Sequence, residues 1–244
     1  MKFWNFKAAE NKTGRLYLYG DISTETWYGD EITPKTFQAD LEALGDIDTL
    51  EVYVSSGGGE VFAGWAIINI LRRHSARKIG YNDGVAASMA FDILMAMDEV
   101  VACENSMFMT HNCATLASGN KTELRQIADR MEEIDIMLAK NAAARSGKTP
   151  EEMEAIRAAE TWYTPEEALA AGFIDRIDAS FTAAASLDKK YLEKYKNIPP
   201  AVAISGAAED PADVQGIIQP VADIDLTAQR MKLNAIRRKI NGGI

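Results

Sequence analysis

The stretch LEVYVSSGGGEVFAGWAIINILRRH, residues 50–74, contains a strand pattern, a glycine turn and a helix pattern in direct succession. Residues 50–55 form a short β-prone run that ends at Ser56 and three glycines. Apolar residues then recur at helical spacing, at Val61, Trp65, Ile68 and Leu71. The stretch therefore predicts a strand that leads through a tight glycine turn into a helix packed on the sheet.

The same alternation continues in both directions along the chain. Strand patterns occur at 15–20, 76–82, 98–104, 106–111 and 173–178, and helix patterns occur at 33–44, 85–97 and 121–145 and after Thr149 and Thr164. Repeated strand–helix–strand units pack as a mainly parallel sheet with helices on its faces. We therefore expect an α/β fold. Within the helix at 121–145, we expect an apolar core stripe formed by Leu124, Ile127, Met131, Ile134 and Leu138.

The composition changes near Ala179. Residues 181–197 are rich in Ala and Lys, and residues 199–216 carry the Pro and small residues typical of a linker. Residues 225–240 have the pattern of an amphipathic helix with a basic end. We expect one domain at 1–179 and a C-terminal extension at 180–244.

Charge and cysteine content exclude several classes of function. The net charge of −10 argues against a protein that binds nucleic acid or an anionic membrane, because phosphates attract Lys and Arg. The two cysteines, Cys103 and Cys113, cannot form a disulfide framework, and with the two histidines they make no metal-ligand pattern. Because we find neither a secretory signal nor a membrane-spanning run, we expect a cytoplasmic protein without a metal or a cofactor.

Several residues suggest serine-based acyl transfer, which needs a nucleophile, a base, an acid to orient the base, and N–H donors for the oxyanion. Ser88 lies in the run VAASMAF, at an expected strand-to-helix junction, and His111 follows the apolar strand SMFMT. The acid would come from a later segment, where Glu160 and Asp175 are both candidates. Each residue alone is more often structural than catalytic, and the GxSxG motif is absent. These residues by themselves indicate only an α/β protein with a candidate Ser–His site.

Four runs in the same order resemble the Clp-type serine peptidase family. These runs are VYVSSGGGEVFAGWAI (52–67), DGVAASMA (83–90), MFMTHN (107–112) and ETWYTPEEALAAGFIDRI (160–177). The resemblance implies a ClpP/crotonase-like superhelical spiral of β-β-α units with a mainly parallel sheet. It also implies a homo-oligomer that stacks as rings, in which the helix at 121–145 packs one ring against the other.

The resemblance assigns roles to individual residues. It makes Ser88 the nucleophile and His111 the general base, and it places the acid at Glu160, where typical members carry Asp. It also implies that Gly59 and Met89 supply the oxyanion N–H groups, and that Gly58 shapes the substrate-binding loop. A second departure is Gly57, where the family usually has Pro.

The flanking sequence resembles the phage head-maturation branch of the family. The features are the start MKFWNFK, the Trp27–Asp30 loop and the long extension after Ala179. The branch implies a capsid or scaffold protein as substrate and a location within a procapsid. The extension is then either a self-processed segment, a targeting arm or an unstructured remnant.

Three other hypotheses stay open. One is a housekeeping-type Clp proteolytic subunit that works with a Clp-type ATPase. Another is a crotonase-fold acyl-CoA enzyme that uses carboxylates as acid and base. The third is a ring-forming assembly protein without activity, which the Glu at position 160 would favour.

Overall fold

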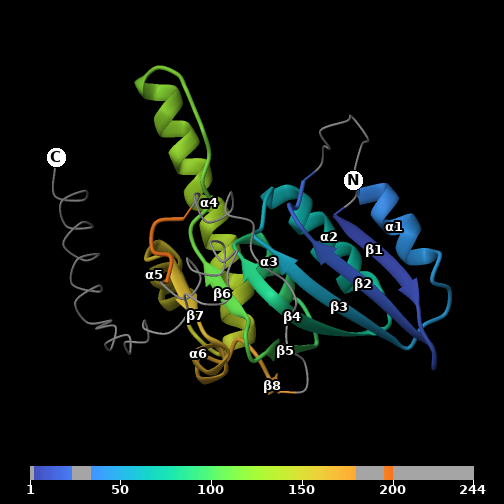
Figure 1. Cartoon of the computed structure of the whole chain (residues 1–244). Helices are drawn as coiled ribbons and strands as arrows, with labels where there is room; N and C mark the ends of the chain where they lie inside the picture. The colour runs from blue at the N-terminus through green and yellow to red at the C-terminus, as the bar shows by residue number, and fades with distance from the viewer. Residues whose placement is uncertain (1–2, 24–33, 180–194, 200–244) are drawn as a thin grey trace, which may run out of the picture.

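The computed structural model describes residues 3–23, 34–179 and 195–199 (Figure 1). Most of the predicted extension at 180–244, including its helix candidate at 225–240, and the Trp27–Asp30 loop lie outside the described residues. The strands are β1 (Trp4–Ala8), β2 (Thr13–Tyr19), β3 (Thr49–Ser56), β4 (Arg77–Ala87), β5 (Glu99–Cys103), β6 (Met107–Thr110), β7 (Thr161–Tyr163) and β8 (Arg176–Asp178). The helices are α1 (Pro34–Glu42), α2 (Val61–Arg73), α3 (Met89–Leu94), α4 (Lys121–Ser146), α5 (Pro150–Ala158) and α6 (Pro165–Ala170).

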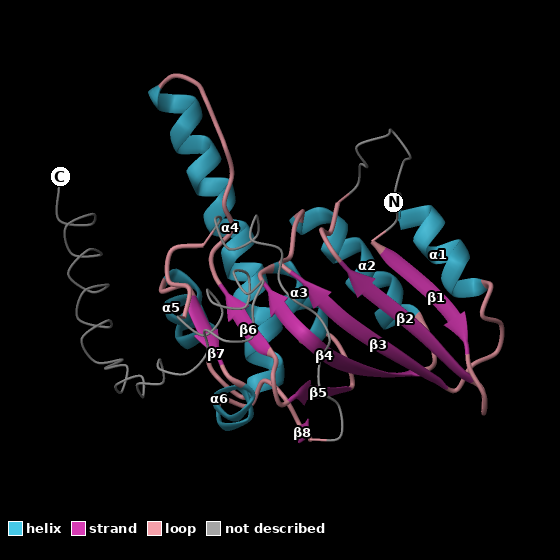
Figure 2. Ribbon diagram, viewed as in Figure 1, coloured by secondary structure: helices cyan, strands magenta, loops and turns pink. Residues whose placement is uncertain are grey.

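The strands form a mainly parallel sheet in the order β1-β2-β3-β4-β5-β8 (Figure 2). Strand β1 pairs antiparallel with β2, and β6 branches from β4 in parallel and carries β7 antiparallel. The predicted α/β fold with a mainly parallel sheet is confirmed. The short strands β1 and β7 were not predicted.

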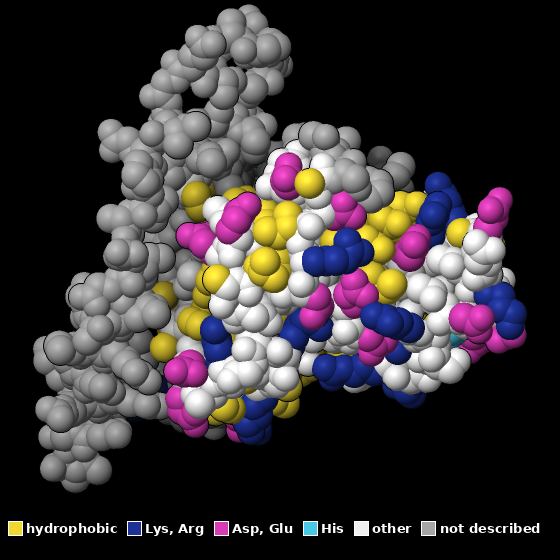
Figure 3. Space-filling view, turned by 90° about the horizontal axis from the view of Figure 1, so that it is seen from below, with side chains coloured by type: hydrophobic (Ala, Val, Ile, Leu, Met, Phe, Trp, Pro, Cys, Tyr) yellow, Lys and Arg dark blue, Asp and Glu magenta, His cyan; other side chains and the backbone are white. Residues whose placement is uncertain are grey.

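The core lies between the sheet and its helices. Alternate strand residues such as Leu16, Val52 and Val54 are fully buried and share one cluster with Phe37 of α1 and Ile67 of α2. The intervening residues of β2, β3 and β4 point to the other side of the sheet. There Tyr17, Tyr53 and Tyr81 stack in a row, with ring centroids 5.0 and 4.8 Å apart. The face seen in Figure 3 shows hydrophobic side chains intermingled with basic and acidic ones.

Strand β4 is longer than the sequence predicted, and the helix that follows it is shorter. A helix over 85–97 was expected, but Val85–Ala87 continue the strand and α3 covers only Met89–Leu94. The reason is a change of partner within β4. Residues 79–82 pair with β5, whereas residues 85–87 pair with β6. The buried Asn82 side chain stabilises the crossover by donating to the Met107 carbonyl at 2.8 Å.

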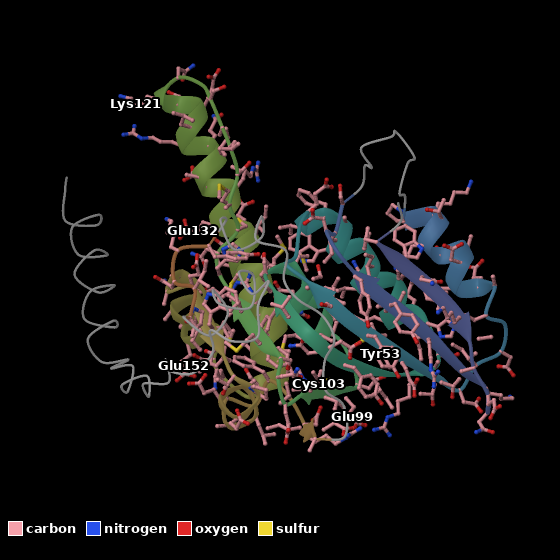
Figure 4. All side chains as sticks on the ribbon, viewed as in Figure 1. Tyr53, Glu99, Cys103, Lys121, Glu132 and Glu152 are labelled. Carbon is pink, nitrogen blue, oxygen red and sulfur yellow. The ribbon has the colours of Figure 1, made fainter. Side chains whose placement is uncertain are left out.

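Helix α4 extends beyond the body of the molecule, as Figures 1 and 4 show, with Lys121 at its far end and Glu132 nearer the sheet. An Asn120 capping box begins it, and Gly147 ends it with a left-handed backbone. The predicted core stripe is confirmed only toward the C-terminal end of the helix, where Leu138 is buried and Ile134 packs partly buried against the core. Of the five stripe residues only Leu138 is buried, and Leu124 is 41% exposed. Ile127 and Met131 are half-buried, so the first half of the stripe is only partly covered by the described residues.

Candidate active site

Ser88 lies between β4 and α3 in a strained backbone conformation. Its φ of 55° and ψ of −124° are unusual for a residue other than glycine. Such a conformation costs about 1–3 kcal/mol and persists only where the surrounding structure holds it. Here the Ser88 N–H donates to the Met109 carbonyl of β6 at 2.9 Å. The strand-to-helix junction thus sets the hydroxyl at the start of a helix.

His111 lies directly after β6, and its Nε2 is 2.8 Å from the Ser88 Oγ. Strands β4 and β6 are paired from Val85–Met107 to Ala87–Met109, so the chain brings the ends of both strands to one place. This distance is within hydrogen-bond range for a base and the hydroxyl that it activates. The two residues that the sequence singled out from separate motifs are therefore in contact.

The surroundings of His111 favour its neutral form. Burial of the ring lowers its pKa below 6.5, and the nearby positive charge of Arg157 lowers the pKa further. The negative charges of Glu160 and Asp135 act in the opposite direction. A neutral imidazole can accept the proton of Ser88, so the environment suits the role of a base near neutral pH.

The glycine loop after β3 approaches Ser88 closely. A side chain on Gly58 would come within 2.7 Å of the Ser88 Cβ and 2.9 Å of the Met89 nitrogen, and its φ is +92°. A side chain on Gly59 would come within 2.0 Å of the Ile22 carbonyl oxygen. Only glycine fits at both positions.

Two backbone N–H groups at this place are candidate oxyanion donors. Met89 is the first residue of α3, so its N–H has no partner within the helix. Its side chain fills the space beside Gly64 of α2, where an added Cβ would come within 2.2 Å of it. In the short bridge between the glycine loop and Ile22, the Ile22 N–H donates to the Gly58 carbonyl and the Glu60 N–H donates to the Ile22 carbonyl. The Gly59 N–H takes no part in this bridge.

Glu160 follows α5 with a left-handed backbone, at a φ of 50°. Its Oε1 accepts the N–H groups of Lys196 and Asn197, each at 2.6 Å. Within the described residues, Glu160 makes no hydrogen bond to His111, although its charge reaches the imidazole. The structure therefore brings Glu160 to the edge of the site but gives its carboxylate a different partner.

Asp175, the other candidate acid, lies elsewhere. Its Oδ2 accepts the Val100 N–H at 2.7 Å and forms an ion pair with Arg145. It lines a polar pocket of about 330 Å³ together with residues such as Arg72 and Gly172. The structure does not bring Asp175 to His111.

A buried ion pair lies behind the Ser–His pair, and the sequence analysis did not identify it. Asp92 of α3 and Arg157 of α5 are 3.0 Å apart, with side-chain exposures of 1% and 2%. Arg157 also donates to the Thr110 hydroxyl at 2.8 Å, next to His111. Desolvation raises the pKa of Asp92, and the Arg157 charge opposes that rise. The signal in the sequence was a lone acid within the apolar run 85–97.

A second unpredicted neighbour is Tyr195. Its ring meets the His111 ring edge-on at 5.5 Å between centroids, and its hydroxyl donates to the Gly57 carbonyl. It packs in a small apolar cluster with Trp162 and Met109. The sequence of the Ala- and Lys-rich segment 181–197 has no pattern that would predict this contact.

The described residues contain no group of three or more His, Cys, Asp or Glu side chains arranged to hold a metal ion. They also contain no helix of the length and hydropathy needed to cross a membrane.

A family model described as Clp protease matches residues 10–180 of the chain. The chain belongs to the Clp protease family. The match covers the glycine loop, the Ser88 elbow, the His111 strand end and Glu160.

Curated Clp relatives match the same part of the chain at low identity. An ATP-dependent Clp protease proteolytic subunit 2 from Thermobifida fusca (strain YX) is 29% identical over 132 residues, which are 52% of this chain and 64% of that protein. A proteolytic subunit from Porphyromonas gingivalis is 29% identical over 153 residues, or 61% of this chain and 69% of that protein. Subunit 2 from Tropheryma whipplei is 28% identical over 62% of this chain and 88% of that protein. The chain thus spans slightly less than two thirds of the first of these Clp relatives.

Proposed function

We propose that this chain is a serine endopeptidase of the Clp type, with its catalytic domain at 1–179 and an extension at 180–244. The observation that carries the proposal is the 2.8 Å contact between the Ser88 Oγ and the His111 Nε2. The strained backbone at Ser88 and the close approach of the glycine loop to it support the same function, since costly backbone conformations cluster at active sites.

The geometry supports the following chemistry. His111 takes the proton of Ser88 as the Oγ attacks the peptide carbonyl, and it returns that proton to the leaving amine. The N–H groups of Gly59 and Met89 stabilise the oxyanion, and water then hydrolyses the acyl-enzyme. Glu160 is proposed to orient His111 and to stabilise the imidazolium when its carboxylate turns toward the ring.

We assign the protein to the phage head-maturation branch, with a capsid or scaffold protein as substrate and the cytoplasm or a procapsid as its location. The support is the resemblance of the flanking sequence and the long extension. We further propose a homo-oligomeric stacked ring. The apolar stripe on the first half of α4, including Leu124 at 41% exposed, gives such an assembly a surface to bury.

A housekeeping-type subunit that works with an ATPase is the second candidate. The names of the relatives, which describe ATP-dependent Clp proteolytic subunits, favour it. The half-buried tyrosine stack of Tyr17, Tyr53 and Tyr81 would offer such a partner aromatic surface.

Cleavage of a fluorogenic peptide by the purified full chain tests the function. We expect turnover that Ser88→Ala abolishes and that Ser118→Ala, the same change on an exposed loop, leaves intact. Cleavage of a protein substrate with and without an added Clp-type ATPase separates the two candidates, because a head-maturation protease needs no ATPase to cleave a protein. Turnover that persists in Ser88→Ala would refute the proposal.

A further inference from the structure

Residues 195–199 lie against the candidate site, although the preceding residues 180–194 are not described. Tyr195 is 9% exposed and packs with Val85, Ala87, Met109 and Trp162. Two of these four residues belong to the end of β4, immediately before Ser88. Tyr195 therefore packs on an apolar surface formed by these four residues, next to Ser88. We call this surface the cradle.

The same segment contacts three parts of the proposed catalytic apparatus. The Tyr195 ring lies edge-on to His111, at 5.5 Å between centroids. The Tyr195 hydroxyl donates to the carbonyl of Gly57, in the glycine loop. The N–H groups of Lys196 and Asn197 both donate to Glu160. The base, the oxyanion loop and the proposed acid are thus all in contact with one short piece of chain.

The contact with Glu160 has a chemical consequence. Two N–H donors at 2.6 Å bind one oxygen of a carboxylate, and hydrogen bonds of this charge-assisted kind are strong. The Asn197 side chain adds a bond of 2.9 Å to the Ala159 carbonyl. These bonds hold Glu160 toward the segment, and among the described residues it makes no hydrogen bond to His111.

We propose that residues 195–199 are an internal ligand of the candidate active site and that the described conformation is latent. Tyr195 occupies the cradle that a substrate side chain would use, and Lys196 and Asn197 hold Glu160 away from His111. A substrate has to displace the segment before Glu160 can turn to the imidazole. This inference rests on the proposed peptidase function, since it specifies how that site is regulated.

The arrangement has a clear alternative, in which the segment completes the site and keeps Glu160 in place for catalysis. The two alternatives predict opposite effects when the cradle is emptied. A latent site becomes more active when Tyr195 is lost, because the fraction of molecules open to substrate increases. A site that needs the segment becomes less active.

The experiment compares the wild-type full chain with Tyr195→Ala, and it uses Tyr19→Ala, the same change at an exposed position of β2, as a matched control. The readouts are kcat/KM for a fluorogenic peptide and the amount of Ser88 that a fluorophosphonate probe titrates. We expect kcat/KM to rise by about tenfold in Tyr195→Ala, through a lower KM, since a competing internal ligand reduces apparent affinity. We expect the titrated amount of Ser88 and the control to match the wild type. An unchanged or lower kcat/KM in Tyr195→Ala would overturn the latent state.

Amide hydrogen exchange tests the docking without any need for activity. In the wild type, the N–H groups of Lys196 and Asn197 should exchange slowly, and Tyr195→Ala should remove that protection. Fast exchange of both groups in the wild type would overturn the inference. If the amides are protected but Ser88 reacts in neither chain, the docking stands and the proposed peptidase function fails, so the two failures are distinguishable.

Discussion

The carboxylate of Asp92 and the guanidinium of Arg157 form a fully buried ion pair, 3.0 Å apart, that links α3, which follows Ser88, to β6, which precedes His111. Asp92 lies one turn into α3, and its N–H donates to the Ser88 carbonyl at 3.2 Å. Arg157 in turn holds the hydroxyl of Thr110, the residue before His111. The pair therefore connects the backbone of Ser88 with that of His111 through the core.

Breaking this pair from one side should be costly. We expect Arg157→Met to lower the free energy of unfolding by about 3–5 kcal/mol, because it leaves a buried carboxylate without its partner. The double variant Asp92→Leu, Arg157→Met should recover most of that loss. Arg130→Met, which removes an exposed ion pair with Glu133, should cost less than about 1 kcal/mol. Urea unfolding of the four chains measures these values, and equal losses for Arg157→Met and Arg130→Met would contradict the role of the buried pair.

The acid limb of the pH profile should report His111. Burial and Arg157 lower its pKa, so half-maximal kcat/KM is expected below pH 6.5. The proton must leave His111 before it can act as a base, so activity falls as the pH drops through this lowered value. Glu160→Gln should move the limb to still lower pH, because the Glu160 charge raises the His111 pKa. A limb above pH 6.5 in the wild type would show that the charge balance around the imidazole differs from the one described.

The glycine loop should tolerate no side chain. Gly58→Ala would place a Cβ 2.7 Å from the Ser88 Cβ and adopt a φ of +92°, which strains any other residue. We expect kcat for a peptide to fall at least about 100-fold, comparable to the loss of an oxyanion donor. Gly45→Ala serves as the control, because it also has a positive φ but faces open space. Near-normal kcat in Gly58→Ala would separate the loop from catalysis.

The proposed role of Glu160 is best measured in a chain in which residues 195–199 no longer bind its carboxylate. In the Tyr195→Ala background, Glu160→Gln should lower kcat by about 1,000-fold or more, since an amide does not stabilise the imidazolium and favours the wrong tautomer. Glu166→Gln, the same change at an exposed position of α6, should have no effect. A loss of kcat below about tenfold, which is about 1.4 kcal/mol of activation free energy, would mean that His111 works without this acid.

The sequence predicted the sheet well because strands and helices follow local patterns, and it singled out Ser88 and His111, which the structure brings into contact. Strand and helix periods placed most elements, and the motifs around Ser88 and His111 lie at strand ends that parallel pairing brings together. The extent of β4 was missed because the hydrophobic run 85–97 fits a buried strand and a buried helix equally well. The change of strand partner at Asn82 decides between them, and that is a tertiary effect.

Other features could not be predicted because they depend on contacts between distant segments. The Asp92–Arg157 pair joins residues 65 positions apart, and the Tyr195–Gly57 bond joins residues 138 positions apart. Helix periodicity identified the stripe on α4, but it does not say whether a stripe is buried by its own chain or left for another surface.

Site-resolved labelling with a fluorophosphonate tests the central claim most directly. The full chain is incubated with the probe, digested and analysed by mass spectrometry. We predict a single adduct on Ser88, which forms faster as the pH rises through the His111 pKa and is absent after His111→Ala. Equal labelling of the His111→Ala chain, or an adduct on another serine with Ser88 unmodified, would contradict the account.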